Sequence, residues 1–140
     1  MAGTEELIDE LAGLALFADL GRPELAGIAH TLEEEWHADG QRILREGLSG
    51  TGFFVVLEGE VSVRLGDAEL ARLRRGSYFG EAAILLGELP GADVVAVGRV
   101  RVVNLAGPAL QDFLMRHPNV MYRMLQEQTR RLRGAIRWRR

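Results

Sequence analysis

The stretch SYFGEAAILLGELPGADVVA, residues 77–96, combines residue types that can hold a phosphate group. Gly80 allows close approach to the backbone, Glu81 offers a carboxylate to a hydroxyl, and two small alanines then begin a short apolar run that predicts a helix. The first turn of a helix presents unpaired N–H groups and the positive end of its dipole, which attract an anion. Between Arg75 and Arg99, however, the sequence contains no arginine or lysine. The expected cation is therefore missing.

No other residue pattern points to catalysis or metal binding. Without cysteine, the chain has no disulfide, no cysteine nucleophile and no thiolate ligand for a metal or an iron–sulfur cluster. His30, His37 and His117 are scattered without the spacing of metal or haem ligands, and no Ser/His/Asp pattern is recognisable. Paired carboxylates such as Glu33 and Glu35 are expected at a solvated helix end. The sequence thus predicts a non-enzymatic protein with no metal and no cofactor.

Length and composition indicate an ordinary globular protein. The chain has 140 residues, 47% of them apolar and 26% charged, which predicts a single domain with its own core. No window of 18 uninterrupted apolar residues is available to span a membrane, and the acidic N-terminus does not resemble a signal peptide. We therefore expect a cytoplasmic protein without a membrane span.

The net charge of −3 conceals a basic C-terminus. Residues 1–114 contain 9 basic and 19 acidic side chains, whereas residues 115–140 contain 8 basic ones and a single acid, Glu127. Such a segment suits nucleic acid, membrane lipid or an acidic partner, but a solvated helix face is the simpler interpretation. The sequence shows no helix-turn-helix, so DNA binding by this chain alone is not expected.

Helical spacing of apolar residues marks both ends of the chain. Residues 4–20 predict a helix capped by Thr4, and a second helix is expected from Pro23 to about Glu35. Residues 107–116 predict a third, with a proline in its first turn. Pro118 opens the last helix, in which one stripe is formed by Met121, Met124, Leu125, Gln128, Leu132 and Ile136.

Between residues 39 and 105 the apolar period becomes that of β-strands. Short runs rich in valine, isoleucine and phenylalanine are separated by glycine, which favours an antiparallel sandwich or barrel. Val55, Val63 and Leu65 are expected inside it, where packing explains them without a role in a base pocket. The expected strands are RILRE (42–46), FFVVLE (53–58), EVSVRL (60–65), ELARLR (69–74), DVVAV (93–97) and RVRVVNL (99–105). The expected turn glycines are Gly47, Gly50, Gly52, Gly59, Gly66 and Gly76.

The run GQRILREGLSGTGFFVVLEGEVSVRL (40–65), followed by GSYFGEAAILLGE (76–88), resembles the cyclic nucleotide-binding domain family. The family includes catabolite-activator-type regulators, regulatory subunits of cAMP-dependent kinase and nucleotide-gated channels. A specific joint signal is made by GxxIxxEG, an aromatic-apolar strand, GEVSV and FGE, in that order. The resemblance covers nearly the whole chain. The resemblance implies a mainly β fold with flanking helices, an eight-stranded antiparallel jelly roll, in one domain of residues 1–140. Its parts would be N-terminal helices (1–36), a β-barrel (37–106) and C-terminal helices (107–140).

The resemblance also implies a phosphate cassette at residues 78–96. In the family, the FGE glycine lets the backbone approach the ligand, the glutamate accepts the ribose 2′-hydroxyl, and the following N–H groups face the cyclic phosphate. Glu81 would otherwise be a surface carboxylate at a helix start, and Phe79 is expected to be core rather than a platform for the ligand. The ligand-binding positions expected on this basis are Phe79, Gly80, Glu81, Ala82, Ala83, Pro90, Gly91, Ala92 and Asp93.

The family's phosphate-binding arginine has no counterpart in this sequence. Aligned through ADVVA without a gap, its position falls on Pro90, and with a shift of one residue it falls on Gly91. Losing one charge-assisted pair costs about 1.5–3 kcal/mol, or roughly ten- to a hundredfold in affinity. Asp93 would add repulsion if it pointed at the phosphate. A substitute cation could come from the preceding strand and turn, from Arg72, Arg74 or Arg75, but solvent-facing positions are expected there.

The implied function is that of a regulatory or sensor module. The ligand would be cAMP or cGMP, and because the arginine is missing its binding is expected to be weak or lost. A bound ligand would order residues 80–93 and reposition the helix at 118–138. That helix would pack on its own barrel or pair with a second subunit, so a homodimer through it is expected. The alternative is a degenerate fold that no longer binds cAMP and serves as a protein-interaction or dimerisation module. An uncharged or different ligand, such as a dinucleotide or haem, is a third option, and the sequence does not identify an effector domain or partner protein.

Overall fold

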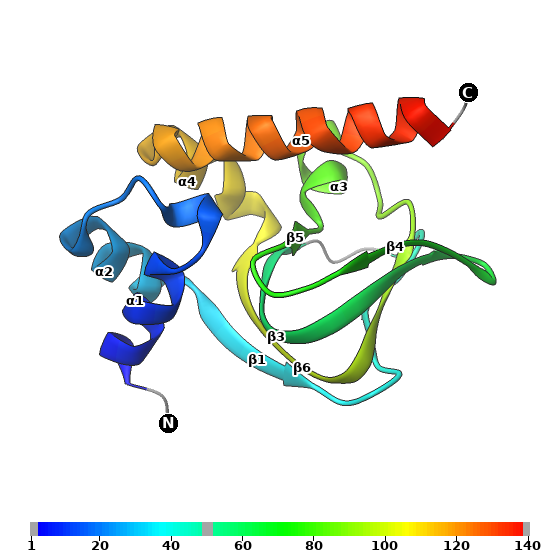
Figure 1. The fold of residues 1–140 in the computed structure, drawn as a ribbon, viewed down its shortest axis with the longest axis horizontal. Coiled ribbons are helices and arrows are strands. Elements are labelled where there is room, and N and C mark those ends of the chain that lie inside the picture. The colour runs from blue at the N-terminus through cyan, green and yellow to red at the C-terminus, as the bar shows by residue number, and fades with distance from the viewer. Residues whose placement is uncertain (1–2, 49–51, 139–140) are drawn as a thin grey trace. The chain divides into compact units, whose positions relative to one another are not determined.

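The computed structural model describes residues 3–48 and 52–138, and its two compact units consist of residues 1–29 with 112–140 (unit 1) and residues 30–111 (unit 2). Helices flank a group of strands along the chain (Figure 1). In chain order the elements are α1 (Thr4–Ala12), the 3₁₀ helix η1 (Ala15–Phe17), α2 (Arg22–Thr31), β1 (Glu33–His37), β2 (Arg42–Leu44), β3 (Gly52–Leu65), β4 (Ala68–Leu73), β5 (Tyr78–Phe79), α3 (Glu81–Leu86), β6 (Asp93–Ala106), the 3₁₀ helix η2 (Gly107–Ala109), α4 (Leu110–Arg116) and α5 (Pro118–Trp138).

Unit 2 is built on one antiparallel sheet. The strand order is β1-β6-β3-β4, with β2 also pairing with β6 and β5 with β3. The sheet therefore has six strands within the described residues, and the expected eight strands and closed barrel are not confirmed. β3 and β6 are each 14 residues long and curve strongly (Figure 1), so each joins two runs that the sequence predicted as separate strands.

Gly59 and Gly98 make these long strands continuous. Both have left-handed backbone conformations, with φ of 81° and 70°, and the register between β3 and β6 shifts on either side of Glu58. A Cβ on Gly59 would lie 2.5 Å from the carbonyl oxygen of Arg99. Gly59 was therefore wrongly expected to mark a turn, because it forms a bulge within a strand. Gly50 lies outside the described residues.

One face of the sheet carries an apolar cluster, which we call the inner cluster. Its partly buried members include Val63, which confirms the expectation of an inward position. Val55 is buried but lies between two members of the cluster on β3, so alternation places it on the opposite face. Leu65 is 46% exposed, so the inward position predicted for it is wrong. The buried members are Leu44, Phe54, Val56, Val61, Phe79, Val94, Ala96, Val100 and Val102.

Two strands were missed from the sequence. Residues 33–37 were assigned partly to a helix end, but they form β1, which pairs antiparallel with β6 from Glu33 opposite Asn104 to His37 opposite Val100. β5 consists of only two residues, too few to produce a period. In both cases a partner distant in the chain supplies the hydrogen bonds, so tertiary pairing overrides local propensity.

The N-terminal helices of unit 1 are shorter than predicted. α1 ends at Ala12, and residues 15–17 form a separate 3₁₀ turn, so residues 4–20 are not one helix. The N-cap is Gly3, without a side-chain cap hydrogen bond, and the predicted cap Thr4 is instead the first helical residue. None of the described helices is both long and apolar enough to cross a membrane.

The C-terminal helices match the sequence closely. Pro108 occupies the first turn of η2 and Pro118 opens α5. The predicted stripe on α5 does not share one environment, because Met124 is 3% exposed whereas four other members are exposed. Those four are Met121, Leu125, Leu132 and Ile136.

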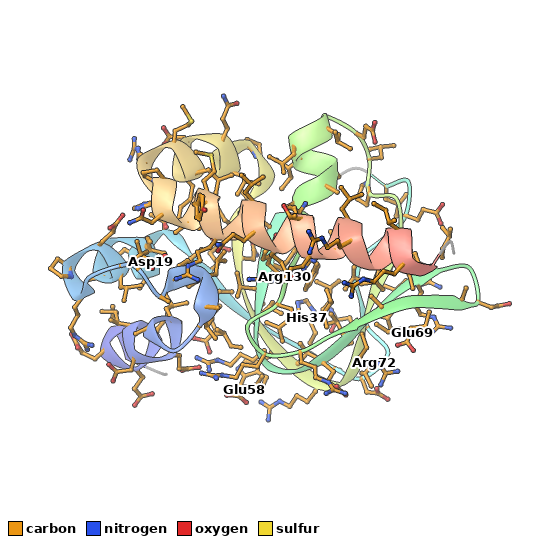
Figure 2. All side chains as sticks on the ribbon, turned by 45° about the horizontal axis from the view of Figure 1, so that its top comes forward. Asp19, His37, Glu58, Glu69, Arg72 and Arg130 are labelled. Atoms are coloured by element: carbon orange, nitrogen blue, oxygen red, sulfur yellow. The ribbon has the colours of Figure 1, made fainter. Side chains whose placement is uncertain are left out.

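Two side-chain pairs join the C-terminal and N-terminal helices within unit 1. The guanidinium of Arg123, on α5, donates to both carboxylate oxygens of Asp19, from Nε at 2.7 Å and from Nη2 at 2.9 Å. Nδ1 of His117, just before α5, lies 2.6 Å from Oε2 of Glu24 on α2. Figure 2 labels Asp19 in this unit. The beginning of α5 is therefore held to the η1–α2 region.

The Asp19–Arg123 pair predicts a pH-dependent contribution to stability. The hydrogen bond from Arg123 holds the pKa of Asp19 below its usual range, so the folded protein favours the ionised form. This contribution is fully present above the pKa of Asp19 in the unfolded chain, about 3.9, and is lost as the pH falls through the lower folded pKa. We expect the free energy of unfolding to fall less steeply between about pH 5 and pH 2 in Asp19→Asn than in the wild type.

Urea unfolding at successive pH values measures this difference. Some acid sensitivity remains in Asp19→Asn, because hydrogen bonds from Arg72 and Ser62 also lower the pKa of Glu69. Asp67→Asn is the control, since the carboxylate of Asp67 makes no hydrogen bond or ion pair with the described residues. Equal slopes for Asp19→Asn and the wild type would contradict the prediction.

Candidate functional site

Gly80 sits where two segments of backbone nearly touch. It is the N-cap of α3, with φ of 91° in the left-handed region, and a Cβ there would lie 2.0 Å from the carbonyl oxygen of Gly52 and 3.3 Å from Cδ1 of Leu44. A side chain is excluded by both the conformation and the space. The protein's own backbone therefore requires glycine here, whatever ligand approaches.

The residues around Gly80 divide between core and surface. Phe79 is 3% exposed and its ring stacks on Phe54, with centroids 4.9 Å apart, so the expectation that it is core is confirmed. Glu81 opens α3 and is 5% exposed, which excludes the alternative of a surface carboxylate. Ala82 is exposed and Ala83 is buried. The helix predicted after FGE is present, although it has only six residues.

The second half of the cassette is fastened to the turn that follows β2. The carbonyl oxygen of Pro90 accepts a hydrogen bond from the N–H of Gly47 at 2.9 Å, and Oδ1 of Asp93 accepts one from the N–H of Glu46 at 2.7 Å. Oδ2 of Asp93 also lies 3.7 Å from Nε of Arg42. The carboxylate of Asp93 thus has protein donors of its own.

Exposure separates the two positions to which the family's arginine can be aligned. Pro90 is buried, whereas Gly91 is exposed, has no positive φ, and has no atom within 4 Å of a Cβ placed on it. Ala92, which follows Gly91 and precedes β6, is half-buried. Of the two positions, Gly91 is the one that can accept a long side chain without rearrangement.

The turn that follows β2 contacts both halves of the cassette, and the sequence did not predict this contact. Leu44 lies against Gly80, the N–H groups of Glu46 and Gly47 bind residues 90–93, and Gly52 faces Gly80. The GxxIxxEG motif contains the first three of these residues. The signal that could have revealed the contact is the glutamate and glycine of this motif, which lie between two strands.

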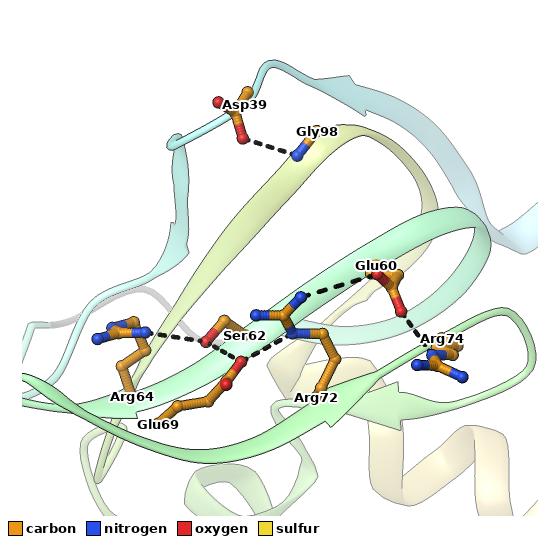
Figure 3. Close-up of polar contacts among 8 residues, drawn as sticks. All are labelled: Asp39, Glu60, Ser62, Arg64, Glu69, Arg72, Arg74 and Gly98. Carbon is orange, nitrogen blue, oxygen red and sulfur yellow. Dashed lines mark hydrogen bonds and ion pairs between the residues drawn. The ribbon is translucent and has the colours of Figure 1, made fainter.

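Arg72, on β4, does not point toward the inner cluster. Val61 and Leu73 are opposite each other and contact the cluster, so their neighbours Ser62 and Arg72, also opposite each other, lie on the outer face. There Nε of Arg72 donates to Oε1 of Glu69 at 2.8 Å (Figure 3).

Further contacts belong to this outer group. Arg74 pairs with Glu60, and the hydroxyl of Ser62 donates to Glu69 (Figure 3). Arg75 is exposed. The outward positions expected for Arg72 and Arg74 are therefore observed, together with carboxylate partners that the sequence did not predict.

Known proteins are similar to this chain in both sequence and fold. Residues 34–117 match the family model "Cyclic nucleotide-binding domain". A cAMP-dependent protein kinase regulatory subunit from Mycosarcoma maydis is 34% identical over 113 residues, which cover 74% of this chain and 22% of that protein. The chain spans less than a third of the length of the curated relatives that it matches.

Solved structures agree with this assignment. PKAR CBD2 bound to Sp-2Cl-cAMPS is similar with a TM-score of 0.79 and 23% identity, covering 94% of this chain and 90% of that one. The regulatory subunit of a cAMP-independent protein kinase A from Trypanosoma brucei gives a TM-score of 0.78 and 25% identity over 91% of this chain and 46% of that one. With a family match over more than half of its residues and a jelly-roll fold in common, the chain belongs to the cyclic nucleotide-binding domain family.

Proposed function

We propose that this chain is the ligand-sensing module of a regulatory protein, that it binds a cyclic nucleotide at residues 78–96 with low affinity, and that it is not an enzyme. The observation that carries the proposal is the close packing of Gly80 on Gly52, followed by the buried Glu81 at the start of α3. The name of the Mycosarcoma maydis relative, a cAMP-dependent kinase regulatory subunit, supports the ligand class.

Residues 80–83 have proposed roles in binding. The N–H groups of residues 80–83 would donate to the cyclic phosphate, and Glu81 would accept a ribose hydroxyl. No cation occurs between Arg75 and Arg99, so these neutral donors would act without a charge-assisted pair. That loss weakens binding by about ten- to a hundredfold relative to a site that has the pair.

Binding would be coupled to α5. The ligand orders residues 80–93 and repositions α5, which requires different ligand affinities for the two positions of the helix. The Arg123–Asp19 and His117–Glu24 pairs hold the beginning of α5 to η1 and α2. The N-terminal helices would therefore move with α5, or these pairs would break.

Titration of cAMP and cGMP tests this function. We expect heat of binding in calorimetry, with a dissociation constant toward 1 mM, equivalent to about −4 kcal/mol. The temperature of thermal unfolding should rise as ligand is added, because a ligand that binds the folded state stabilises it. The absence of both heat and thermal stabilisation at millimolar nucleotide would refute cyclic nucleotide binding.

A second candidate function is protein interaction or dimerisation by a fold that has lost its ligand. Leu85 and Leu86 on α3 and Leu89 after it are more than half exposed, as is the apolar stripe of α5 at Leu125 and Leu132. The similar Trypanosoma brucei structure is the regulatory subunit of a protein kinase A described as cAMP-independent, which supports this alternative. A homodimer through α5 belongs to this alternative.

A further inference from the structure

Helix α5 carries apolar side chains on two different faces. Val120 and Met124 are buried, with exposed fractions of 0% and 3%. A second set is between 39% and 62% exposed and consists of Met121, Leu125, Leu132 and Ile136, which we call the exposed stripe. At 3.6 residues per turn these four lie within an arc of about 60°, roughly a third of a turn away from the buried pair. The packing of α5 therefore leaves the exposed stripe open to solvent.

Arginines line one edge of the exposed stripe. Arg130, Arg133 and Arg137 are spaced by three and four residues, so they share one side of the helix, and all three are exposed. Figure 2 labels Arg130, which pairs with Glu127 at 3.1 Å. Arg133 and Arg137 make no hydrogen bond or ion pair with the described residues. Residues 128–138 contain four arginines and no acid, so this part of α5 has a net charge of +4.

An exposed apolar stripe beside arginines matches the chemistry of an anionic membrane surface. Apolar side chains of such a helix enter the boundary between headgroups and acyl chains, and its basic side chains are attracted to anionic lipids. The long arginine side chain can keep its charge at the headgroups while its stem lies along apolar surface. Helix α5 is already formed in the structure, so binding requires no coupled folding.

Other occupants leave part of this surface unmatched. A parallel pair of α5 helices would cover the exposed stripe, but it would place the four positive charges of residues 128–138 beside four more, with no acid between them. The nearest acid on the helix, Glu127, already pairs with Arg130 and Arg131. Nucleic acid would neutralise the arginines through its phosphates but would leave the exposed stripe in water. Anionic lipid matches both features.

We propose that α5 binds an anionic membrane surface through the exposed stripe and the arginines beside it. The helix lies in the plane of the membrane surface, with Leu125 and Leu132 in the apolar boundary and Arg133 and Arg137 at the lipid phosphates. The surface lies on α5 and uses no residue of the cassette. The inference therefore does not depend on cyclic nucleotide binding.

Co-sedimentation of the whole chain with lipid vesicles, without nucleotide, tests the proposal. One set of vesicles contains equal amounts of phosphatidylserine and phosphatidylcholine, and the other contains phosphatidylcholine alone. We expect the mixed vesicles to bind about tenfold or more tightly than the neutral ones, and this advantage should shrink at high salt. Equal binding to the two sets, or no binding to the mixed vesicles, would overturn the proposal.

A double substitution tests the apolar half of the surface. Leu125→Gln together with Leu132→Gln keeps good helix formers and should weaken binding to the mixed vesicles about tenfold or more. The matched control is Leu85→Gln with Leu86→Gln on α3, two leucines that are also more than half exposed. Unfolding temperatures close to that of the wild type establish that both variants are folded. Equal losses in the two variants would show that α5 is not the binding surface.

A second double substitution tests the arginines. Arg133→Gln with Arg137→Gln should weaken binding to the mixed vesicles about tenfold or more and leave binding to neutral vesicles unchanged. Arg45→Gln with Arg75→Gln changes the net charge of the chain by the same amount at two exposed positions of unit 2, and should bind as the wild type does. If both variants lose the same affinity, only the net charge matters and the assignment to α5 is wrong.

Two measurements identify a different occupant. If sedimentation shows a dimer that Leu125→Gln with Leu132→Gln dissociates, and the mixed vesicles do not bind, the exposed stripe belongs to a second copy and the proposal is overturned. Binding to a short duplex DNA without binding to the mixed vesicles overturns it as well. Neither result affects cyclic nucleotide binding, which the calorimetric titration decides separately.

Discussion

Gly80→Ala is expected to lower the free energy of unfolding by about 3–5 kcal/mol. Two effects add at this position. Alanine is strained at a φ of 91°, and its Cβ would lie 2.0 Å from the carbonyl oxygen of Gly52. The obstructing atom belongs to the backbone of β3, so relief requires a shift of the strand or of α3 rather than a change of rotamer. Urea unfolding monitored by circular dichroism measures the loss.

Two other glycines separate these effects. Gly87, at the end of α3, has φ of 66° but no atom within 4 Å of a Cβ, so Gly87→Ala adds strain alone and should cost about 1–2 kcal/mol. Gly91 has neither restriction, and Gly91→Ala should change stability by less than about 1 kcal/mol. Equal losses for Gly80→Ala and Gly87→Ala would show that the close approach to Gly52 does not constrain residue 80.

Gly91→Arg is expected to tighten cAMP binding by about ten- to a hundredfold. The substitution restores a cation at one of the two positions to which the family's arginine aligns, and a charge-assisted pair with the phosphate is among the stronger hydrogen bonds. The site accepts the side chain, because Gly91 is exposed and open. The loop is also held in place through Pro90 and Asp93 by the turn at Glu46 and Gly47. Calorimetric titration of wild type and variant measures the gain.

The effect of added charge alone is controlled by a second variant, with an arginine two residues before Gly91. Leu89 is 54% exposed, so Leu89→Arg adds the same charge to the same loop without replacing residue 91. Pro90→Arg is a poorer test, because Pro90 is buried and a long charged side chain there would disturb the loop. If Gly91→Arg binds cAMP no more tightly than Leu89→Arg, the cassette is remodelled in more than one residue.

The elements with strong local signals were predictable from the sequence. Helical spacing and Pro118 predicted the start of α5. The apolar period of two residues predicted β2, β4 and the separate halves of β3 and β6. The joining of those halves was not predictable, because glycine marks a turn and a bulge equally well in a sequence. At Gly59 the choice depends on β6, whose backbone at Arg99 leaves no room for a side chain. β1 was missed for a similar reason, since its ladder partner β6 begins some 60 residues later.

By itself the sequence determined the family, the order of the cassette residues and the absence of a cation between Arg75 and Arg99. These follow from residue identity and spacing, which need no partner in space. Tertiary structure decided which way each side chain faces. In the folded chain the carboxylate of Asp93 accepts a hydrogen bond from the N–H of Glu46, and the backbone of Gly52 leaves no room for a side chain at residue 80. His37 lies opposite Val100, on the face of the inner cluster. Side-chain direction depends on strand register and on contacts between segments far apart in the chain, and local periodicity encodes neither.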